Sequence, residues 1–318
     1  MAYAPAGSTT QTPALTHFAT VYYERKPLDR LMAKFRFAAI CDPHPLPQGS
    51  GKTVQFYRFA LPGFNTTPAA EGVIGAPVGQ SSSTFQATVE QYSDFESGSA
   101  LMFETDINDS KDQMIDDLSY RASGTVDTII RTEVDSNTSA QVNPRGVNFS
   151  ADDSKANVSL LEGINVEPFE GDRYRGILHP YLVYDLITDN TAGGFIDAMK
   201  YMAGTQVLNG EVGEVGRVRW LTSTNVKTSG SSPNVLYYAY LFGKHGMGIV
   251  DLQGLGPDHI TDPKNERFRI NFVQGGPNPA DPVGEIAGYA SYRFVFTAKT
   301  LDTTNLRFKI ILADASLV

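Results

Sequence analysis

Residues 52–95 read KTVQFYRFALPGFNTTPAAEGVIGAPVGQSSSTFQATVEQYSDF. Two strand-like runs, Lys52–Leu61 and Ser83–Phe95, flank roughly twenty residues rich in Gly, Pro, Ala and Thr. The second run alternates apolar and polar residues, as a strand with one buried face does. A connection this long is uncommon inside a compact domain and is usually functional. Because a two-stranded ribbon alone is marginal in water, the segment predicts a projecting arm that is buried on another surface.

The chain before this arm contains two kinds of segment. Residues 1–16 are small and polar without periodicity, which predicts a flexible N-terminal arm. A short helix is expected from about Pro27, because proline suits the first helical position and apolar residues then recur at helical spacing up to Phe35. The prolines between Asp42 and Pro47 end it, since alternate prolines cannot continue a helix.

After the arm, residues 110–134 have the clearest helical pattern of the chain. Apolar residues recur at helical intervals from Ile115 to Ile130, and Ser110 and Gln113 have capping-box spacing. Twenty-five helical residues would span about 37 Å. Only one stripe is apolar, so the helix needs a sheet or an elongated surface beside it.

The remaining chain predicts a mixed α/β region followed by strands. A helix capped by Ser150 is expected over Ala151–Leu161, and others begin at Pro180 and after Thr191. Strands are expected at Tyr174–Leu178, Val218–Thr222, Val235–Phe242, Gly248–Leu252 and Phe268–Val273. Alternation over Tyr292–Ala298 and Leu306–Leu312, with a turn at Asp302–Asn305, predicts a closing hairpin with one buried face.

Composition limits the function classes. The chain has 318 residues, 26 basic and 35 acidic, with a net charge of −9. A protein that grips phosphate backbones needs clustered Lys and Arg, so contact with nucleic acid is expected to be weak and non-specific. The single cysteine, Cys41, excludes an internal disulfide. No membrane span and no signal peptide are expected.

The motifs that could carry chemistry favour structural interpretations. Residues 49–53, GSGKT, resemble the end of a phosphate-binding loop, but residue 46 is leucine and a strand is expected where that motif needs a helix. The five histidines lack metal-ligand spacing; His179 before Pro180 has a capping or packing role as its default. Acids around the start of the long helix favour its N-terminus electrostatically, and Trp220 is expected in the core. No cofactor, metal or catalytic residue is predicted.

Several stretches, in this order, resemble one family. They are Tyr22–Leu31, Pro45–Phe59, Ala69–Gly79, Gln91–Phe95, Tyr120–Arg131, His179–Pro180, Asn209–Thr224, Phe242–Val250 and Ser291–Lys299. Together with the order of expected elements, they resemble tailed-bacteriophage major capsid proteins of the Hong Kong 97-type fold, in the branch typified by coliphage N-four.

This resemblance implies an α+β chain with four parts. Residues 1–44 would form the N-terminal arm and short helix, 45–95 the extended loop, 96–150 and 285–318 the peripheral domain with its spine helix, and 151–284 the axial domain.

The resemblance also implies a structural subunit of an icosahedral phage head, not an enzyme. It would assemble into hexamers and pentamers around double-stranded DNA in the virion, after synthesis in the host bacterial cytoplasm. A decoration or cement protein, a scaffold and a portal are implied as further partners. Intersubunit contacts are expected at Lys52, Arg58 and Glu71 on the arm and at Arg25 near the N-terminus.

Two other classes remain open at this point. The first is another β-rich virion protein, such as a decoration or receptor-binding module, which would have no need of the long helix. The second is an α/β hydrolytic enzyme, which a cluster of His with Asp or Ser in a pocket would support.

Overall fold

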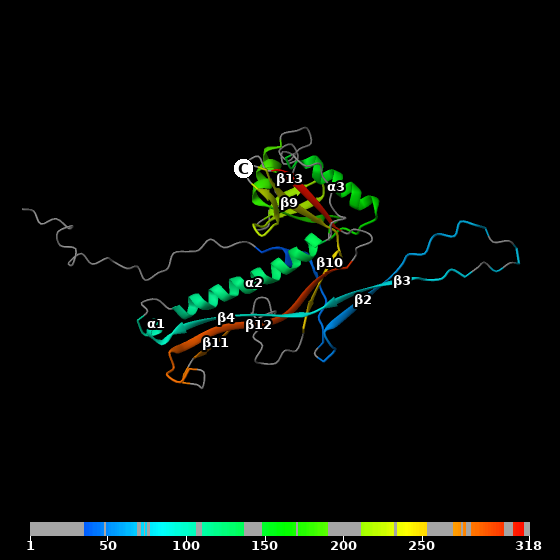
Figure 1. Cartoon of the computed structure of the whole chain (residues 1–318). Helices are drawn as coiled ribbons and strands as arrows, with labels where there is room; N and C mark the ends of the chain where they lie inside the picture. Colours follow the sequence, from blue (N-terminus) through cyan, green and yellow to red (C-terminus); the bar gives the residue numbers. More distant parts are fainter. Residues whose placement is uncertain are drawn as a thin grey trace, which may run out of the picture.

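The computed structural model describes residues 35–47, 49–68, 71–72, 74, 77–105, 110–136, 148–169, 171–189, 211–231, 234–252, 270–274, 276–277, 281–301 and 308–314. It is a mixed helix and strand structure with three parts: an elongated sheet under a long helix, a second sheet with its own helices, and a projecting ribbon (Figure 1).

The long helix α2 (Ser110–Ser136) lies along one face of the first sheet (Figure 1). Its buried apolar side chains are four residues apart: Met114, Leu118, Ala122, Val126, Ile130 and Val134. They pack on the inner face of β12 (Ile286–Thr300), whose buried apolar side chains are Ala290, Tyr292, Phe294, Phe296 and Ala298. The helix and the buried face predicted for residues 292–298 are confirmed, since the apolar stripe of the helix packs on the apolar face of the strand.

Among the described residues, this first sheet has five strands. β12 pairs antiparallel with β4 (Glu90–Ser99) along one edge. The other edge pairs with β10 (Met247–Asp251) and β11 (Ile270–Gln274). β1 (Asp42–Pro43) adds a short parallel pairing to β10. The 3-10 helix η2 (Phe37–Ile40) precedes β1 and lies against α2.

The second sheet has six strands in the described chain. β9 (Asn234–Phe242) pairs with β13 (Phe308–Asp314), β5 (Tyr174–Leu178) and β8 (Thr228–Ser231). β7 (Val218–Thr222) follows β5 in parallel, and β6 (Glu211–Val215) pairs with β7.

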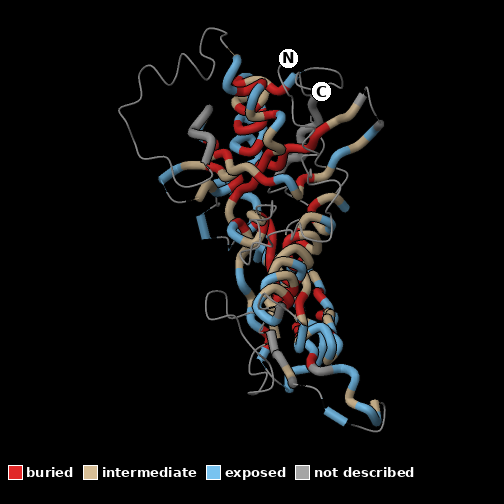
Figure 2. Tube along the Cα trace, turned by 90° about the vertical axis from the view of Figure 1, so that its left-hand side faces the viewer, coloured by how far each residue is buried: buried red, intermediate tan, exposed pale blue. Residues whose placement is uncertain are grey.

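The helices α3 (Ala151–Gly163) and α4 (Pro180–Thr188) share a core with the second sheet. Trp220 and Tyr174 are fully buried there, as predicted for Trp220. Ser150 caps α3 in a complete capping box with Asp153, and His179 caps α4 by accepting from the Tyr181 N–H at 3.2 Å. Figure 2 shows buried residues along the middle of both sheet regions.

Two strand predictions are wrong. The hairpin expected between residues 292–298 and 306–312 does not exist, because β12 belongs to the first sheet and β13 pairs with β9 in the second. Likewise the run 83–95 forms two strands, β3 (Ser82–Thr88) and β4, which separate at Val89 and pair with different partners. Alternation specifies a buried face, but it does not specify which strand lies alongside.

Several elements were not predicted or lie outside the described residues. The elements α1 (Ala100–Thr105), β6 and β8 were not predicted. The helices expected from Pro27 and after Thr191 fall largely or wholly on residues that the structure does not describe. None of the described helices is long and apolar enough to cross a bilayer.

We predict that Gly176→Ala destabilises the second sheet. A Cβ at this position would come within 2.3 Å of the Trp220 ring, which is itself enclosed. Overpacking of this kind costs about 1–3 kcal/mol, so urea unfolding should show a lower free energy of unfolding. Gly163→Ala, at the end of α3 with open space around it, is the control and should be unchanged or slightly stabilised. Equal stability of the two variants would contradict this packing.

Candidate functional site

The projecting ribbon consists of β2 (Thr53–Phe59) and β3, paired antiparallel from Thr53↔Thr88 to Phe59↔Ser82. Two further backbone hydrogen bonds extend the pairing: the Val89 N–H donates to the Lys52 carbonyl and the Ala60 N–H to the Ser81 carbonyl. We call residues 49–89 the arm. Figure 1 shows it extending away from both sheets.

The chain enters the arm through a glycine turn, as predicted. Gly49 and Gly51 both have positive φ, 82° and 88°, which favours glycine. β2 then starts at Thr53. With a strand there in place of a helix, the GSGKT sequence lacks the helix N-terminus that a phosphate-binding loop requires.

The base of the arm is anchored to its own chain. Ala87 and Val89 are buried with Leu46 and Val250 in a small apolar cluster. Arg58 extends the anchoring: its guanidinium donates to the Leu301 carbonyl at 2.7 Å and lies over the Phe85 ring, 5.6 Å from its centroid. These contacts fix the direction in which the arm leaves the body.

The outer half of the arm carries several exposed apolar side chains. Leu61, Phe64 and Ile74 are 96%, 98% and 96% exposed. Tyr57 and Val78 are also largely exposed. Burial of one such side chain contributes about 1.5–3 kcal/mol, and exposed apolar patches mark interaction sites. The arm therefore presents a set of side chains that gain stability only against a second surface.

The four predicted contact residues do not form one group. Lys52 is exposed at the base of the arm and Glu71 is exposed in the segment between its strands. Arg58 contacts its own chain at Leu301. Arg25 lies outside the described residues.

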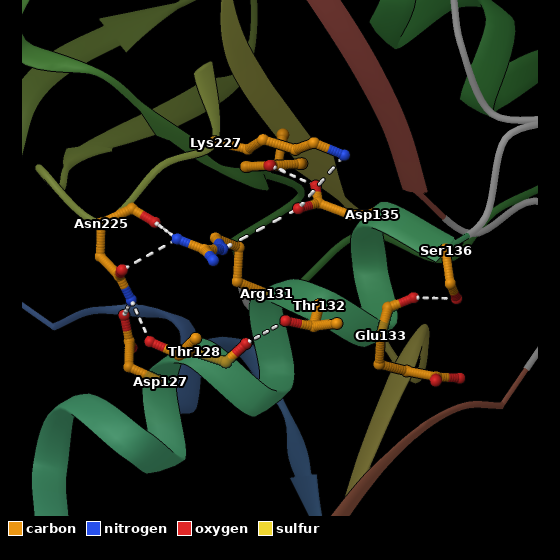
Figure 3. A network of polar contacts seen from close by, with 10 residues as sticks. Asp127, Thr128, Arg131, Thr132, Glu133, Asp135, Ser136, Asn225 and Lys227 are labelled. Carbon is orange, nitrogen blue, oxygen red and sulfur yellow. Dashed lines mark hydrogen bonds and ion pairs between the residues drawn. The ribbon is translucent and has the colours of Figure 1, made fainter. Parts of the chain in front are cut away.

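A second candidate site consists of polar contacts that join the long helix to the second sheet (Figure 3). We call it the Asp127 junction. Asp127 is 1% exposed and accepts from two other segments. The Phe37 N–H at the start of η2 donates at 2.8 Å, and the Asn225 amide after β7 donates at 2.9 Å. One carboxylate thus ties η2, α2 and the loop before β8 together.

The junction continues one and two helical turns along α2. Arg131 donates to both the carbonyl and the side-chain oxygen of Asn225, each at 3.1 Å. The Tyr240 hydroxyl on β9 donates to Asp135 at 2.6 Å, and Lys227 lies 3.9 Å from the same carboxylate. This row on α2 holds the second sheet in a fixed position over the end of the helix (Figure 3).

Burial changes the titration of the junction. Desolvation raises the pKa of the Asp127 carboxyl, although hydrogen bonds from Asn225 and the η2 backbone lower it. Desolvation also raises the pKa of Asp135, opposed by its hydrogen bond from Tyr240. Sequence reasoning missed this site. Its one signal was an acid beside Val126, at the edge of the apolar stripe.

No catalytic arrangement is found in the part of the chain that the structure describes. His179 is used as a helix cap, where burial lowers its pKa, and His245 contacts Asp42 at 2.6 Å on the surface. Within the described residues, no three of His, Cys, Asp and Glu are grouped to hold a metal ion. The arm and the Asp127 junction are therefore the candidate functional features.

No protein-family model and no curated protein matches this sequence. Solved structures do match over nearly the whole chain. The capsid structure of the cyanophage P-SCSP1u has a TM-score of 0.68 at 10% identity, covering 95% of this chain and 94% of that one. The cyanophage Pam1 capsid gives 0.67 at 11% identity with 98% and 99% covered. The capsid of Ralstonia phage GP4 gives 0.65 at 13% identity with 94% and 95% covered.

These similarities establish the fold. The chain has the α+β, Hong Kong 97-type fold of phage capsid proteins, as the sequence predicted.

We predict that Asp127→Ala lowers the free energy of unfolding by about 2–4 kcal/mol, because it leaves the buried Phe37 N–H without its acceptor and removes the nearer acceptor of the Asn225 amide. Chemical denaturation of the free subunit measures this. Asp116→Ala, an exposed site on the same helix, is the control and should stay within about 0.5 kcal/mol.

The pH dependence of that difference is a second readout. Since the pKa of folded Asp127 is raised, the folded chain binds more protons than the unfolded chain between the ordinary pKa of about 3.9 and the raised value. The stability of the wild type relative to Asp127→Ala should therefore increase as pH falls through this window. A relative stability that decreases there would contradict the burial of the carboxylate.

Proposed function

We propose that this chain is the major capsid protein of a tailed bacteriophage, a structural subunit of the head that assembles into hexamers and pentamers around double-stranded DNA. The observation that carries the proposal is the arm, whose outer apolar side chains are exposed on a subunit with the fold of phage capsid proteins. The specific branch, that of coliphage N-four, remains part of the proposal and is supported by the sequence stretches alone.

In this proposal, the chain has four parts of a capsid subunit. Residues 1–44 would be the N-terminal arm and short helix, 45–95 the extended loop, and 151–284 the axial domain around each capsomer axis. Residues 96–150 and 285–318 would be the peripheral domain. The α2–β12 packing supports the peripheral assignment, because it gives that region a long, rigid shape on which a neighbour's arm can lie. In contrast to the proposed extent of the loop, β4 from Glu90 pairs with β12 in the sheet.

The assembly mechanism would couple burial to association. The arm is fixed at its base by Arg58 and the Ala87 cluster, so little orientational freedom is lost when its outer half docks. Each subunit gives one arm and receives one, which is a heterologous contact that can close into rings and shells. Strand pairing with the neighbour is one available mode.

A structural role, with no catalysis, fits the same observations. The proposed location is the virion capsid, after synthesis in the host bacterial cytoplasm. A decoration or cement protein, a scaffold and a portal are the further partners proposed. The net charge of −9 supports weak, non-specific contact with packaged DNA. A decoration or receptor-binding module is not favoured, because the similarity to capsid proteins extends over nearly the whole chain.

We predict that deleting residues 64–80 leaves soluble subunits that form no shells, because the deletion removes the exposed side chains Phe64, Ile74 and Val78. Electron microscopy and sedimentation of the expressed protein measure this. The control is Gln80→Ser, an exposed polar position on the same segment, which should assemble normally. Intact shells from the deletion variant would refute the proposal, and discrete trimers or monomers of the wild type would favour the other classes.

We also predict different outcomes for the charged arm residues. Lys52→Gln and Glu71→Gln should lower the yield of shells without changing the melting temperature of the free subunit, since both side chains are exposed. Arg58→Gln should lower both, because it removes the contact to the Leu301 carbonyl. Differential scanning fluorimetry and shell yield measure the two effects. If Lys52→Gln and Glu71→Gln leave the yield unchanged, the intersubunit roles are wrong.

A further inference from the structure

A cavity of about 270 Å³ opens beside β5 and β7 in the second sheet. Three of its lining residues are arginines, and we call it the arginine pocket. It is lined by Phe169, Gly171, Arg173, Tyr174, Arg175 and Arg219. The proposed function does not use it.

The sheet register explains why the arginines converge. Arg173 and Arg175 are two residues apart on one extended segment, so they lie on the same face. Arg219 is the register partner of Arg175 in the parallel pair β5–β7. All three side chains line the same pocket. The same face continues to Ile177, which is buried in the core under α2, so the pocket lies at the edge of the covered surface.

Arg175 is held in a defined orientation. Its guanidinium donates to the Ala39 carbonyl at 3.1 Å and lies over the Phe169 ring, 4.6 Å from its centroid. Phe169 is fixed in turn by its N–H, which donates to the Arg173 carbonyl at 2.9 Å. A guanidinium has five N–H donors, and one is used in this contact. A planar fork oriented in this way suits bidentate binding of an oxyanion.

Two carboxylates near the pocket are engaged elsewhere. Asp172, on the turn between Phe169 and Arg173, pairs with Arg217, and Glu167 pairs with Lys244 at 2.8 Å. Arg173 and Arg219 make further contacts within the chain. The cationic character of the pocket depends on the convergence of three guanidinium groups and not on any of them lacking a partner.

The charge of the whole chain favours one kind of oxyanion. With 35 acidic against 26 basic residues, a second copy approaches the pocket with many carboxylates. Nucleic acid instead meets a net negative protein, and phosphate-backbone binding depends on extended basic surfaces. On the premise of the assembly proposed above, we propose that the arginine pocket binds a carboxylate side chain of a second copy of this chain.

The test compares Arg173→Gln and, as a second variant, Arg219→Gln with the wild type. Lys155→Gln is the control, because it removes the same charge from an exposed pair with Asp152 on α3. At an ionic strength of about 0.15 M, both arginine variants should yield shells at least about fivefold less well, since a charge-assisted hydrogen bond is lost at every contact. Sodium succinate should inhibit wild-type assembly more than sodium chloride of equal ionic strength does. The two salts should inhibit assembly of the arginine variants equally.

The outcomes separate the pocket from the proposed function. Arginine variants that assemble as well as Lys155→Gln would overturn the inference and leave the shell role intact. Variants that assemble normally but retain less DNA in the particle would overturn it in favour of a nucleic-acid site. If the wild type forms no shells, the proposed function fails. Carboxylate binding to the pocket is then tested on the free subunit. Succinate should then raise the melting temperature of the wild type, but not of Arg173→Gln, by about 2 °C over sodium chloride, and no such difference would overturn the inference.

Discussion

The account depends on one contrast within the described residues: the arm is anchored to its own chain at its base, whereas the large apolar side chains of its outer half are exposed. Ala87 and Val89 are buried in the body, whereas Leu61, Phe64 and Ile74 are almost fully exposed. A two-stranded ribbon is marginal by itself, which supports the proposal that the outer half is stabilised by a second molecule. In the proposed shell, every copy would offer such a surface to the next.

Packing and polar contacts join the other parts of the molecule. The apolar stripe of α2 covers the inner face of β12 along most of its length, and Arg121 adds ion pairs to Asp94 and Glu96 on β4. The Asp127 junction then fixes the second sheet relative to the helix. The contacts at its base also tie the arm to the body. A fixed direction is what a repeated contact between identical copies requires.

Much of the fold was predictable, because local patterns determine local structure. The stripe of α2, the capping Ser150 and the strand Tyr174–Leu178 have strong periodicity or capping signals, and the structure confirms them. Strand partners were less predictable, since β12 and β13 share the same alternation but belong to different sheets. The Asp127 junction was missed because its partners, Phe37 and Asn225, are 90 and 98 residues away in the sequence. The arm was predicted from its length and composition, although its second strand ends earlier than expected.

The central claim is that the outer arm is buried by a neighbouring copy and not by its own chain. Hydrogen–deuterium exchange of the arm amides, compared between free subunits and assembled particles, tests it most directly. The account predicts that the amides of the outer ribbon, Tyr57–Phe59 in β2 and Ser82–Thr84 in β3, exchange quickly in the free subunit. They should exchange much more slowly after assembly, while the amides of α2 change little. Arm amides that are already protected in the free subunit, and do not change on assembly, would contradict it.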